Sequence, residues 1–284
     1  MLENSFIHIP GIGANTERQL WNTGLLGWEQ LESDNSCKIS PKRYQKLVVH
    51  AKESVKHLKN NDPNYFSNLL PSKEHWRLFP HFRSSTAYLD IETTGIEIYG
   101  FEITTIALYD GRSIRYYVKG QNLEAFTDDI RHYGVIVTYN GKTFDVPFIE
   151  GQFGIKMNHA HIDLRYILKS LGYTGGLKMC EKSLGMDRGD LDGVDGYFGV
   201  LLWLDYQQNK NEKALETLLA YNIEDVVNLE ILMVMAYNMK LKDTPFYKSH
   251  QLELPTRPEI PFKPDLATIN RLKTQFFRSS ESFY

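Results

Sequence analysis

Two acidic residues interrupt an otherwise apolar stretch, TAYLDIETTG, at residues 86–95. Its other members are typical of a buried strand, and in a strand Asp90 and Glu92 point to the same face, about 7 Å apart. Like charges this close repel each other unless a cation lies between them or one carboxyl takes a proton. Carboxylates are the ligands of hard cations such as Mg²⁺ and Mn²⁺, so the pair is a candidate metal site. Taken alone, the pair fits the solvated face of an edge strand better.

Two further acids occupy positions from which they could join the pair. The stretch VIVTYNGKTFDVPFIEGQFG (135–154) predicts a strand, a turn, and a helix that begins near Asp145. The stretch LLAYNIEDVVNLEILMVM (218–235) predicts a long helix in which Tyr221 and Asp225 share one face, because they are four residues apart. Each has a structural alternative: Asp145 could only cap its helix, and Tyr221 could be a core residue with a buried hydroxyl.

The order of these motifs is more specific than any one of them. D-x-E on a strand, Asp at a strand-to-helix turn, and Y-x-x-x-D on a late helix resemble the DEDD family of 3′–5′ exonucleases in the ribonuclease-H-like superfamily. The resemblance is carried by YLDIETTG, TYNGKTFDVPF and AYNIEDVVNLE and covers residues 86–237. Tyr221 occupies the position of the tyrosine subclass, whereas the histidine subclass would have His at residue 220, which is Ala220 here. Within that subclass the chain is similar to the YprB-like predicted exonucleases.

The resemblance implies a phosphodiesterase that uses two Mg²⁺ or Mn²⁺ ions. Asp90 would bridge the two ions, Glu92 and Asp225 would complete the first site, and Asp145 would help to hold the second through water. Tyr221 would orient or deprotonate the attacking water. These five residues are the predicted catalytic residues, and the four acids are the predicted metal ligands.

Neighbours of the acids are candidates for contacts with the substrate. Three follow the first strand, where a terminal nucleotide would lie in such enzymes, and three surround Asp145 and could contact a phosphate or stack on a base. The alternatives are an ordinary turn for the first three and core packing for the phenylalanine. The predicted substrate-binding residues are Thr93, Thr94, Gly95, Asn140, Lys142 and Phe144.

A separate nucleic-acid-binding element is predicted near the N-terminus. The stretch IHIPGIGANTERQLWNTGLLGWEQL (7–31) resembles a helix-hairpin-helix element, whose tight turn presents backbone N–H groups to a phosphate without reading sequence. Residues 38–59 hold seven Lys and Arg against one acid, Glu53, a local charge of +6 that would add phosphate contacts. The alternative is a solvated helix face. The predicted nucleic-acid-binding residues are Gly11, Ile12, Gly13, Lys42, Arg43 and Lys46.

The elements that must position these residues divide the chain into four parts. A meander of strands (86–92, 102–109 and 113–118) followed by alternating helices and strands predicts an α/β fold, a ribonuclease-H-like mixed sheet flanked by helices. A small helical N-terminal domain precedes it. The predicted division is a helical region at 1–60, a linker at 61–80, the exonuclease domain at 81–241, and a proline-rich tail at 242–284 with a short helix at 265–277.

Composition narrows the function classes. The chain has 284 residues, 42% of them hydrophobic, and can bury a full-sized core, but its net charge of −3 says nothing about a polyanionic partner. Cys37 and Cys180 form no metal-ligand spacing and no disulfide framework, and no long apolar run occurs, so we expect a soluble, cytoplasmic protein without a membrane partner. The expected substrate is DNA or RNA, as single strands or duplex ends, and the tail could bind a protein partner. A structure-specific endonuclease on the same fold and a non-catalytic nucleic-acid-binding protein remain alternatives.

Overall fold

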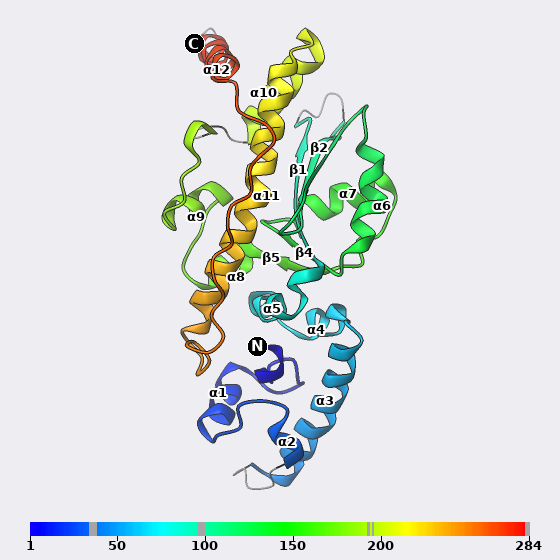
Figure 1. Cartoon of the computed structure of the whole chain (residues 1–284), viewed down its shortest axis with the longest axis vertical. Helices are drawn as coiled ribbons and strands as arrows, with labels where there is room; N and C mark the ends of the chain where they lie inside the picture. The colour runs from blue at the N-terminus through cyan, green and yellow to red at the C-terminus, as the bar shows by residue number, and fades with distance from the viewer. Residues whose placement is uncertain (34–38, 96–99, 192–193, 195, 282–284) are drawn as a thin grey trace.

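A mixed sheet of five strands lies at the centre of the larger part of the molecule (Figure 1). The computed structural model describes residues 1–33, 39–95, 100–191, 194 and 196–281. The strand order is β3-β2-β1-β4-β5; β1 pairs antiparallel with β2 and parallel with β4, as the predicted meander followed by alternation requires. The strands are β1 (Thr86–Thr93), β2 (Ile103–Tyr109), β3 (Ile114–Val118), β4 (Val135–Thr138) and β5 (Ala160–Asp163).

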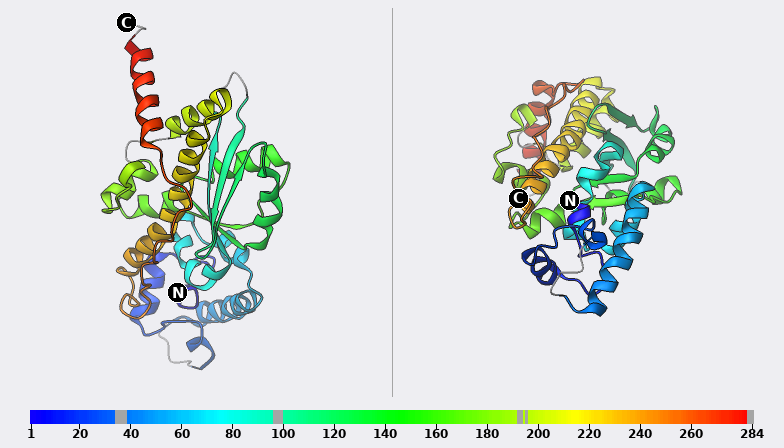
Figure 2. Two further views of the ribbon diagram at one scale, coloured as in Figure 1. Left: turned by 45° about the horizontal axis from the view of Figure 1, so that its top comes forward. Right: turned by 60° about the horizontal axis from the view of Figure 1, so that its bottom comes forward.

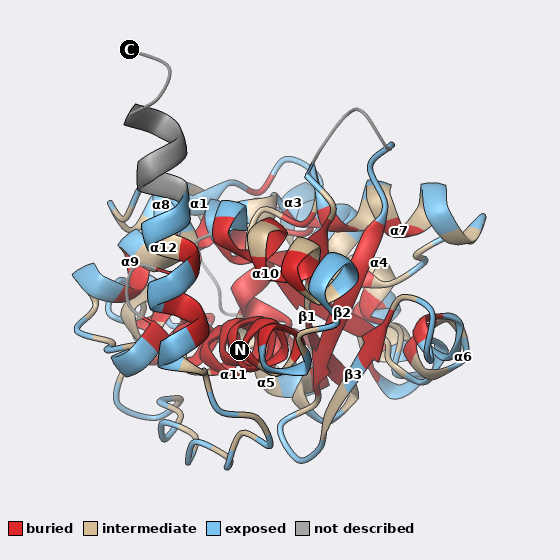
Figure 3. Cartoon of the chain, turned by 90° about the horizontal axis from the view of Figure 1, so that it is seen from above, coloured by how far each residue is buried: buried red, intermediate tan, exposed pale blue. Residues whose placement is uncertain are grey.

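Helices cover both faces of this sheet, which confirms the predicted fold class. Ala87, Leu89 and Ile91 of β1 belong to the core that Phe126 and Ile149 share on one face. The alternate residues of β1 face the long helix α11, which is buried over most of its length (Figure 3). The helices of this part are η5 (Leu123–Ala125), α6 (Phe126–Asp129), η6 (Ile130–His132), α7 (Asp145–Phe153), α8 (Leu164–Ser170), α9 (Leu177–Ser183), η7 (Gly189–Leu191), α10 (Gly196–Asn209) and α11 (Glu212–Leu241).

The first 60 residues form a helical region at one end of the molecule, beyond the start of β1 (Figure 1). None of the described helices, here or elsewhere, is long and apolar enough to cross a membrane. The helices of this region are η1 (Leu2–Asn4), α1 (Ala14–Asn22), α2 (Gln30–Ser33) and α3 (Pro41–Lys59).

The segment at 61–80, predicted to be a linker, is folded into short helices. The Asn-Asp-Pro sequence that suggests a break is a helix start, because the Asp62 side chain accepts a hydrogen bond from the Tyr65 N–H and Pro63 is the first helical residue. Phe66 and Trp76 are buried, so the segment contributes to the core between the helical region and the sheet. Its helices, with the one that leads into β1, are α4 (Pro63–Leu69), η2 (Ser72–Arg77), α5 (Phe79–Phe82) and η3 (Arg83–Ser85).

The C-terminal segment runs back along α11 before it forms α12 (Leu266–Glu281), which is longer than the predicted helix at 265–277 (Figure 2). Asn238 of α11 exchanges two hydrogen bonds with the backbone of Leu252 (2.8 and 2.9 Å). Further along, the Asp265 N–H donates to Thr217 Oγ1 (2.9 Å). These bonds hold the extended part of the predicted tail against the protein's own surface.

Candidate active site

Three carboxylates from two elements meet where β1 crosses α11. Asp90 and Glu92 point to the same face of β1, because side chains alternate along a strand, and this face lies against α11 (Figure 1). Asp225 of α11 completes the group: one oxygen from each residue lies within 4.8 Å of the others. Asp90 is partly exposed, whereas Glu92 and Asp225 are buried. We call Asp90, Glu92 and Asp225 the carboxylate cluster.

Neighbouring side chains hold the two acids of β1 in place. Asn222 Nδ2 donates to Asp90 Oδ2 (2.7 Å), and Asn222 Oδ1 accepts from Thr105 Oγ1 of β2 (3.0 Å). On the other side, α10 leaves room for Glu92 because it carries Gly199, where an added Cβ would lie 2.6 Å from Glu92 Oε2. Neither Asn222 nor Gly199 was expected from the sequence, because both act through contacts between distant segments.

Asp145 lies beside the cluster but is not among the three acids within 4.8 Å. It is buried as the first residue of α7, and its Oδ1 accepts a hydrogen bond from the Ile91 N–H (3.3 Å), between the two acids of β1. Burial, opposed by this hydrogen bond, raises the pKa of Asp145 to about 7. The structure therefore brings the fourth predicted acid to the same end of β1.

The electrostatics of the cluster favour a cation. Removal from water raises the pKa of Asp90 well above its ordinary value, and the charges of Asp225, Asp145 and Glu92 raise it further. Burial likewise raises the pKa of Asp225, although the Arg188 guanidinium opposes this shift. Carboxylates that repel one another in this way are stabilised in their ionised form by a bound cation, and their oxygen atoms suit Mg²⁺ or Mn²⁺.

Tyr221 lies one helical turn before Asp225 and is buried against the cluster. Burial raises the pKa of its hydroxyl well above 10, and the nearby charges of Asp225, Glu92 and Asp90 act in the same direction. The hydroxyl is therefore protonated at neutral pH. The Tyr221 ring also has cations near it: Lys178 Nζ is 4.3 Å from the ring centroid, and Arg188 Cζ is 5.9 Å from it.

Arg188 reaches the cluster from the segment after α9, a position that no sequence pattern predicted. Its Nη2 lies 2.5 Å from Asp225 Oδ1. Its Nε and Nη2 also donate to the two carboxylate oxygens of Glu181 (2.5 and 2.8 Å). The residues around Arg188 carry no motif, so only the folded chain places this guanidinium beside Asp225.

The substrate residues predicted after β1 lie at its end, beside α10. Thr93 is buried, and Thr94 Oγ1 donates a hydrogen bond to the Gly100 carbonyl (3.0 Å). Gly95 has φ +59°, and an added Cβ would lie 2.5 Å from Val200 Cγ2. A glycine is therefore required here both by the backbone conformation and by the close approach of α10.

The three residues predicted around Asp145 have different surroundings. Asn140 has φ +68°, and its N–H donates to Asp163 Oδ1 (2.8 Å), an acid that also caps α8. The Lys142 ammonium donates to Ser72 Oγ of η2 (3.1 Å), so this hydrogen bond is made outside the carboxylate cluster. Phe144 is 40% exposed, and its ring lies 4.8 Å from that of Phe148.

The predicted nucleic-acid-binding residues of the N-terminal region lie close together. Gly13 is the N-cap of α1, and Gly11 has φ +80° with Lys46 Nζ only 3.6 Å from where its Cβ would be. Lys42, Arg43 and Lys46 are exposed on α3; Lys38 lies outside the described residues.

Two features of this turn differ from the predicted hairpin. Ile12 is buried, and its N–H donates to the Ile9 carbonyl (3.0 Å), so it is not available to a phosphate. The turn is preceded only by the short 3₁₀ helix η1 in place of a full helical arm.

Comparison with known proteins gives one family match. Residues 87–237 match the sequence profile of a family described as RNase_H superfamily. Among solved structures, the family B DNA polymerase from the hyperthermophilic archaeon Pyrobaculum calidifontis is similar over 55% of this chain and 24% of the polymerase, with 17% identity and a TM-score of 0.41. The present chain thus corresponds to about a quarter of that polymerase's length. Curated protein sequences give no match.

Proposed function

Because the chain belongs to the RNase H superfamily, we propose that it is a metal-dependent 3′–5′ exonuclease that hydrolyses phosphodiester bonds of DNA or RNA. The observation that carries the proposal is the carboxylate cluster, in which Asp90, Glu92 and Asp225 present oxygens within 4.8 Å of one another. Tyr221, one turn before Asp225, supports the assignment to the tyrosine subclass of DEDD exonucleases.

The donor set suits two Mg²⁺ or Mn²⁺ ions. We assign the first site to Asp90, Glu92 and Asp225, and the second to Asp90 with Asp145, which lies beside the cluster. Bound ions would supply positive charge on both sides of the phosphate and lower the pKa of the attacking water. The raised pKa values of Asp90 and Asp225 support this assignment, because a cation would remove the repulsion that contributes to the Asp90 shift.

Tyr221 would position the attacking water. Its raised pKa keeps the hydroxyl protonated, so the phenol can donate or accept a hydrogen bond but does not exist as a phenolate at neutral pH. The sequence left open whether Tyr221 orients or deprotonates the water. Because the hydroxyl stays protonated, we propose that Tyr221 orients it.

Exposed aromatic rings beside α7 would bind the bases near the 3′ end. An open cleft of about 460 Å³ is lined by Phe101, Phe148, Thr143 and Gln152 among others, and the exposed ring of Phe144 packs against Phe148. Base stacking on aromatic side chains tolerates any sequence. This surface is suited to a single-stranded terminus.

The exposed basic side chains of α3 would contact the backbone of the same nucleic acid farther from its end. As exposed cations, Lys42, Arg43 and Lys46 would contact phosphates, so we expect sequence-independent, salt-dependent binding. Figure 1 shows α3 and the carboxylate-bearing elements β1 and α11 in different parts of the molecule, which suits a substrate longer than a few nucleotides.

The test is cleavage of 5′-labelled single-stranded DNA and RNA oligomers with Mg²⁺ or Mn²⁺. A ladder that shortens from the 3′ end, and is lost in Asp225→Asn, is the expected result. Internally labelled circular strands provide the control, because an exonuclease cannot start on them and an endonuclease can. Binding without cleavage by the wild-type protein would support the non-catalytic alternative.

A further inference from the structure

Arg188 is held beside the carboxylate cluster by a buried chain of polar groups. Its side chain is only 6% exposed, and Glu181, which binds it through two oxygens, is only 1% exposed. Glu181 Oε1 also accepts a hydrogen bond from Asn228 Nδ2 of α11 (2.9 Å), three residues after Asp225. The orientation of the guanidinium is therefore determined by buried partners on α9 and α11.

Such a buried ion pair contributes little to stability, because desolvation of both charges offsets most of their attraction. A buried carboxylate and a buried amide nevertheless fix one guanidinium next to a metal-ligand candidate. Charge that develops in a transition state is stabilised best by a donor that is already rigid and correctly oriented. Such a donor needs no reorganisation during the reaction.

One donor group of this guanidinium is left over. Arg188 Nη1 is buried and has no hydrogen-bond partner within the described part of the chain, whereas Nε and Nη2 are engaged. Leaving a buried donor unmatched destabilises the folded protein, so its presence calls for a ligand that supplies an acceptor. Arginine matches phosphate oxygens particularly well, because its N–H groups form a planar fork.

The charges around Tyr221 point to the same kind of ligand. The acids of the cluster repel a phosphodiester, and positive charge must balance them where the phosphate lies. Arg188 and Lys178 both approach the Tyr221 ring, next to the cluster. A phosphate oxygen at this place would meet a preorganised cationic donor.

We propose that Arg188 is a further catalytic residue, whose Nη1 donates to a non-bridging oxygen of the phosphodiester that is cut, and that Glu181 and Asn228 are the residues that position it. This inference rests on the proposed nuclease function. It adds a substrate contact that the four acids and Tyr221 do not provide.

The test compares Arg188→Gln and Arg188→Lys with the wild-type protein in single-turnover cleavage. The substrates carry either an ordinary phosphate or one phosphorothioate diastereomer, Rp or Sp, at the 3′-terminal linkage. We expect Arg188→Gln to slow cleavage of the ordinary substrate by about 10²–10³-fold, as loss of one preorganised donor does. In one diastereomer, the sulfur replaces the oxygen that Arg188 contacts. For that diastereomer, Arg188→Gln should cleave the oxygen and sulfur substrates at nearly equal rates, because the variant has already lost the contact. For the other diastereomer, the rate ratio should stay as in the wild-type protein.

Arg83→Gln is the matched control. Arg83 also pairs with a buried glutamate of α11, Glu230 (2.8 Å), but makes no contact with the carboxylate cluster in the described structure. Arg83→Gln should keep the wild-type cleavage rate and the wild-type rate ratios between the oxygen and sulfur substrates. If Arg188→Gln does not fold, as judged by thermal unfolding, the same rate ratio measured for Arg188→Lys decides between the two outcomes.

The outcomes separate this inference from the proposed function. The inference alone is overturned if the wild-type protein cleaves the oligomers and the Arg188 variant shows the same cleavage rate and the same oxygen-to-sulfur rate ratios. A wild-type protein that cleaves no oligomer with either metal overturns the proposed function and the inference with it.

Discussion

At the scale of single residues, the carboxylate cluster is under electrostatic strain without a cation. Burial, together with the charges of Asp225, Asp145 and Glu92, holds the pKa of the Asp90 carboxyl well above the value in an unfolded chain. A carboxyl with a raised pKa destabilises the folded state at every pH above its unfolded value, because the unfolded chain ionises more readily. The acids of the site thus lower the stability of the metal-free protein.

Asp90→Asn should therefore stabilise the metal-free protein at pH 7, since it removes one of the repelling charges and keeps an acceptor for Asn222. The expected rise in Tm is about 2–4 °C for each kcal/mol of repulsion removed. Thermal unfolding in a chelator measures it, and added Mn²⁺ should raise the Tm of the wild-type protein more than that of the variant. A lower Tm for the metal-free variant would contradict the predicted repulsion.

Tyr221→Phe tests the role of the hydroxyl, because the ring and its packing remain. Loss of a group that orients the attacking water should lower kcat by about 10²-fold, at the lower end of what proton-transfer groups contribute. Substrate binding and Tm should stay close to the wild-type values. A kcat unchanged by the substitution would mean that Tyr221 is only a core residue.

At the scale of elements, the close approach of α10 to β1 shapes the site. Gly199 lets the helix backbone lie against Glu92, and an added Cβ at Gly95, at the end of β1, would lie 2.5 Å from Val200 Cγ2 of α10. Gly95 is the last residue of the YLDIETTG motif, whereas Gly199, which determines the space left for the Glu92 carboxylate, belongs to no recognised motif.

Gly199→Ala should displace the Glu92 carboxylate, because the new methyl group would lie 2.6 Å from its Oε2. Changes that reorient metal ligands typically weaken metal affinity by about 10–100-fold. Gly196→Ala is the control on the same helix, since an added Cβ there meets no atom of the described residues within 4 Å. Mn²⁺ titration of both variants measures the difference, and equal affinities would contradict the proposed position of Glu92.

The elements that carry the acids were predictable because their signals are local. Alternation along β1 and the four-residue spacing on α11 follow from strand and helix geometry, and the helix predicted to begin near Asp145 is α7, which begins at that residue. The folded segment at 61–80 was not predicted, because its Asp and Pro are compatible with both a break and a helix start. Arg188 and Glu181 were missed for a different reason: they meet Asp225 and Asn228 of α11 only in the folded chain.

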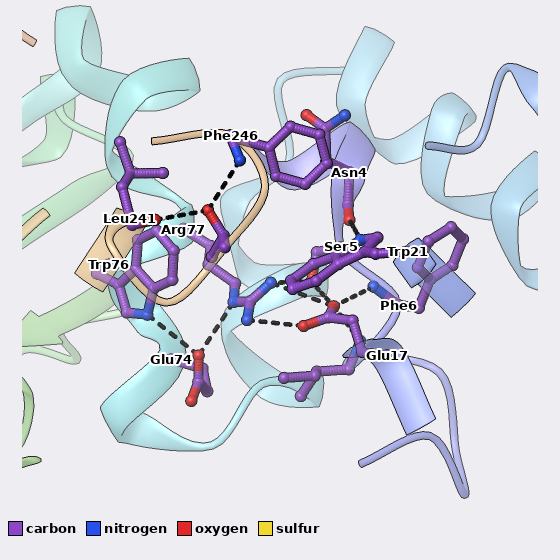
Figure 4. A network of polar contacts seen from close by, with 12 residues as sticks. Asn4, Ser5, Phe6, Glu17, Trp21, Glu74, Trp76, Arg77, Leu241 and Phe246 are labelled. Atoms are coloured by element: carbon purple, nitrogen blue, oxygen red, sulfur yellow. Dashed lines mark hydrogen bonds and ion pairs between the residues drawn. The ribbon is translucent and has the colours of Figure 1, made fainter. Parts of the chain in front are cut away.

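At the scale of the whole molecule, a buried polar network joins the N-terminal helical region to the segment that leads into the sheet (Figure 4). The Arg77 guanidinium of η2 binds both carboxylate oxygens of Glu17 in α1 (2.9 and 3.2 Å) and Glu74 Oε2 (3.0 Å). Glu17 also accepts a hydrogen bond from the Phe6 N–H (2.7 Å). The centroid of the Trp76 ring lies 4.9 Å from Arg77 Cζ. The region is therefore attached by specific contacts as well as by the chain.

Glu17→Gln should destabilise the protein by about 1.5–3 kcal/mol, because the buried Arg77 loses its charge-assisted hydrogen bonds to Glu17 and keeps Glu74 as its one carboxylate partner among the described residues. We expect the wild-type protein to unfold in one transition and the variant to lose the N-terminal region first. Denaturant unfolding followed by tryptophan fluorescence measures both effects, because Trp21 and Trp28 lie in that region. Glu53→Gln is the control, since Glu53 pairs with Lys56 and His57 at the surface of α3; equal loss of stability in both variants would contradict the role of the network.

Whether the carboxylate cluster is a metal centre is decided by Mn²⁺ binding, followed by electron paramagnetic resonance in the presence of a nucleoside 5′-monophosphate, the expected product. We predict two bound ions per chain in the wild-type protein and weakened binding in both Asp90→Asn and Asp225→Asn. A wild-type protein that binds no Mn²⁺ at millimolar concentration, or variants that bind it as well as the wild type does, would contradict the assignment of the carboxylate cluster as a metal centre.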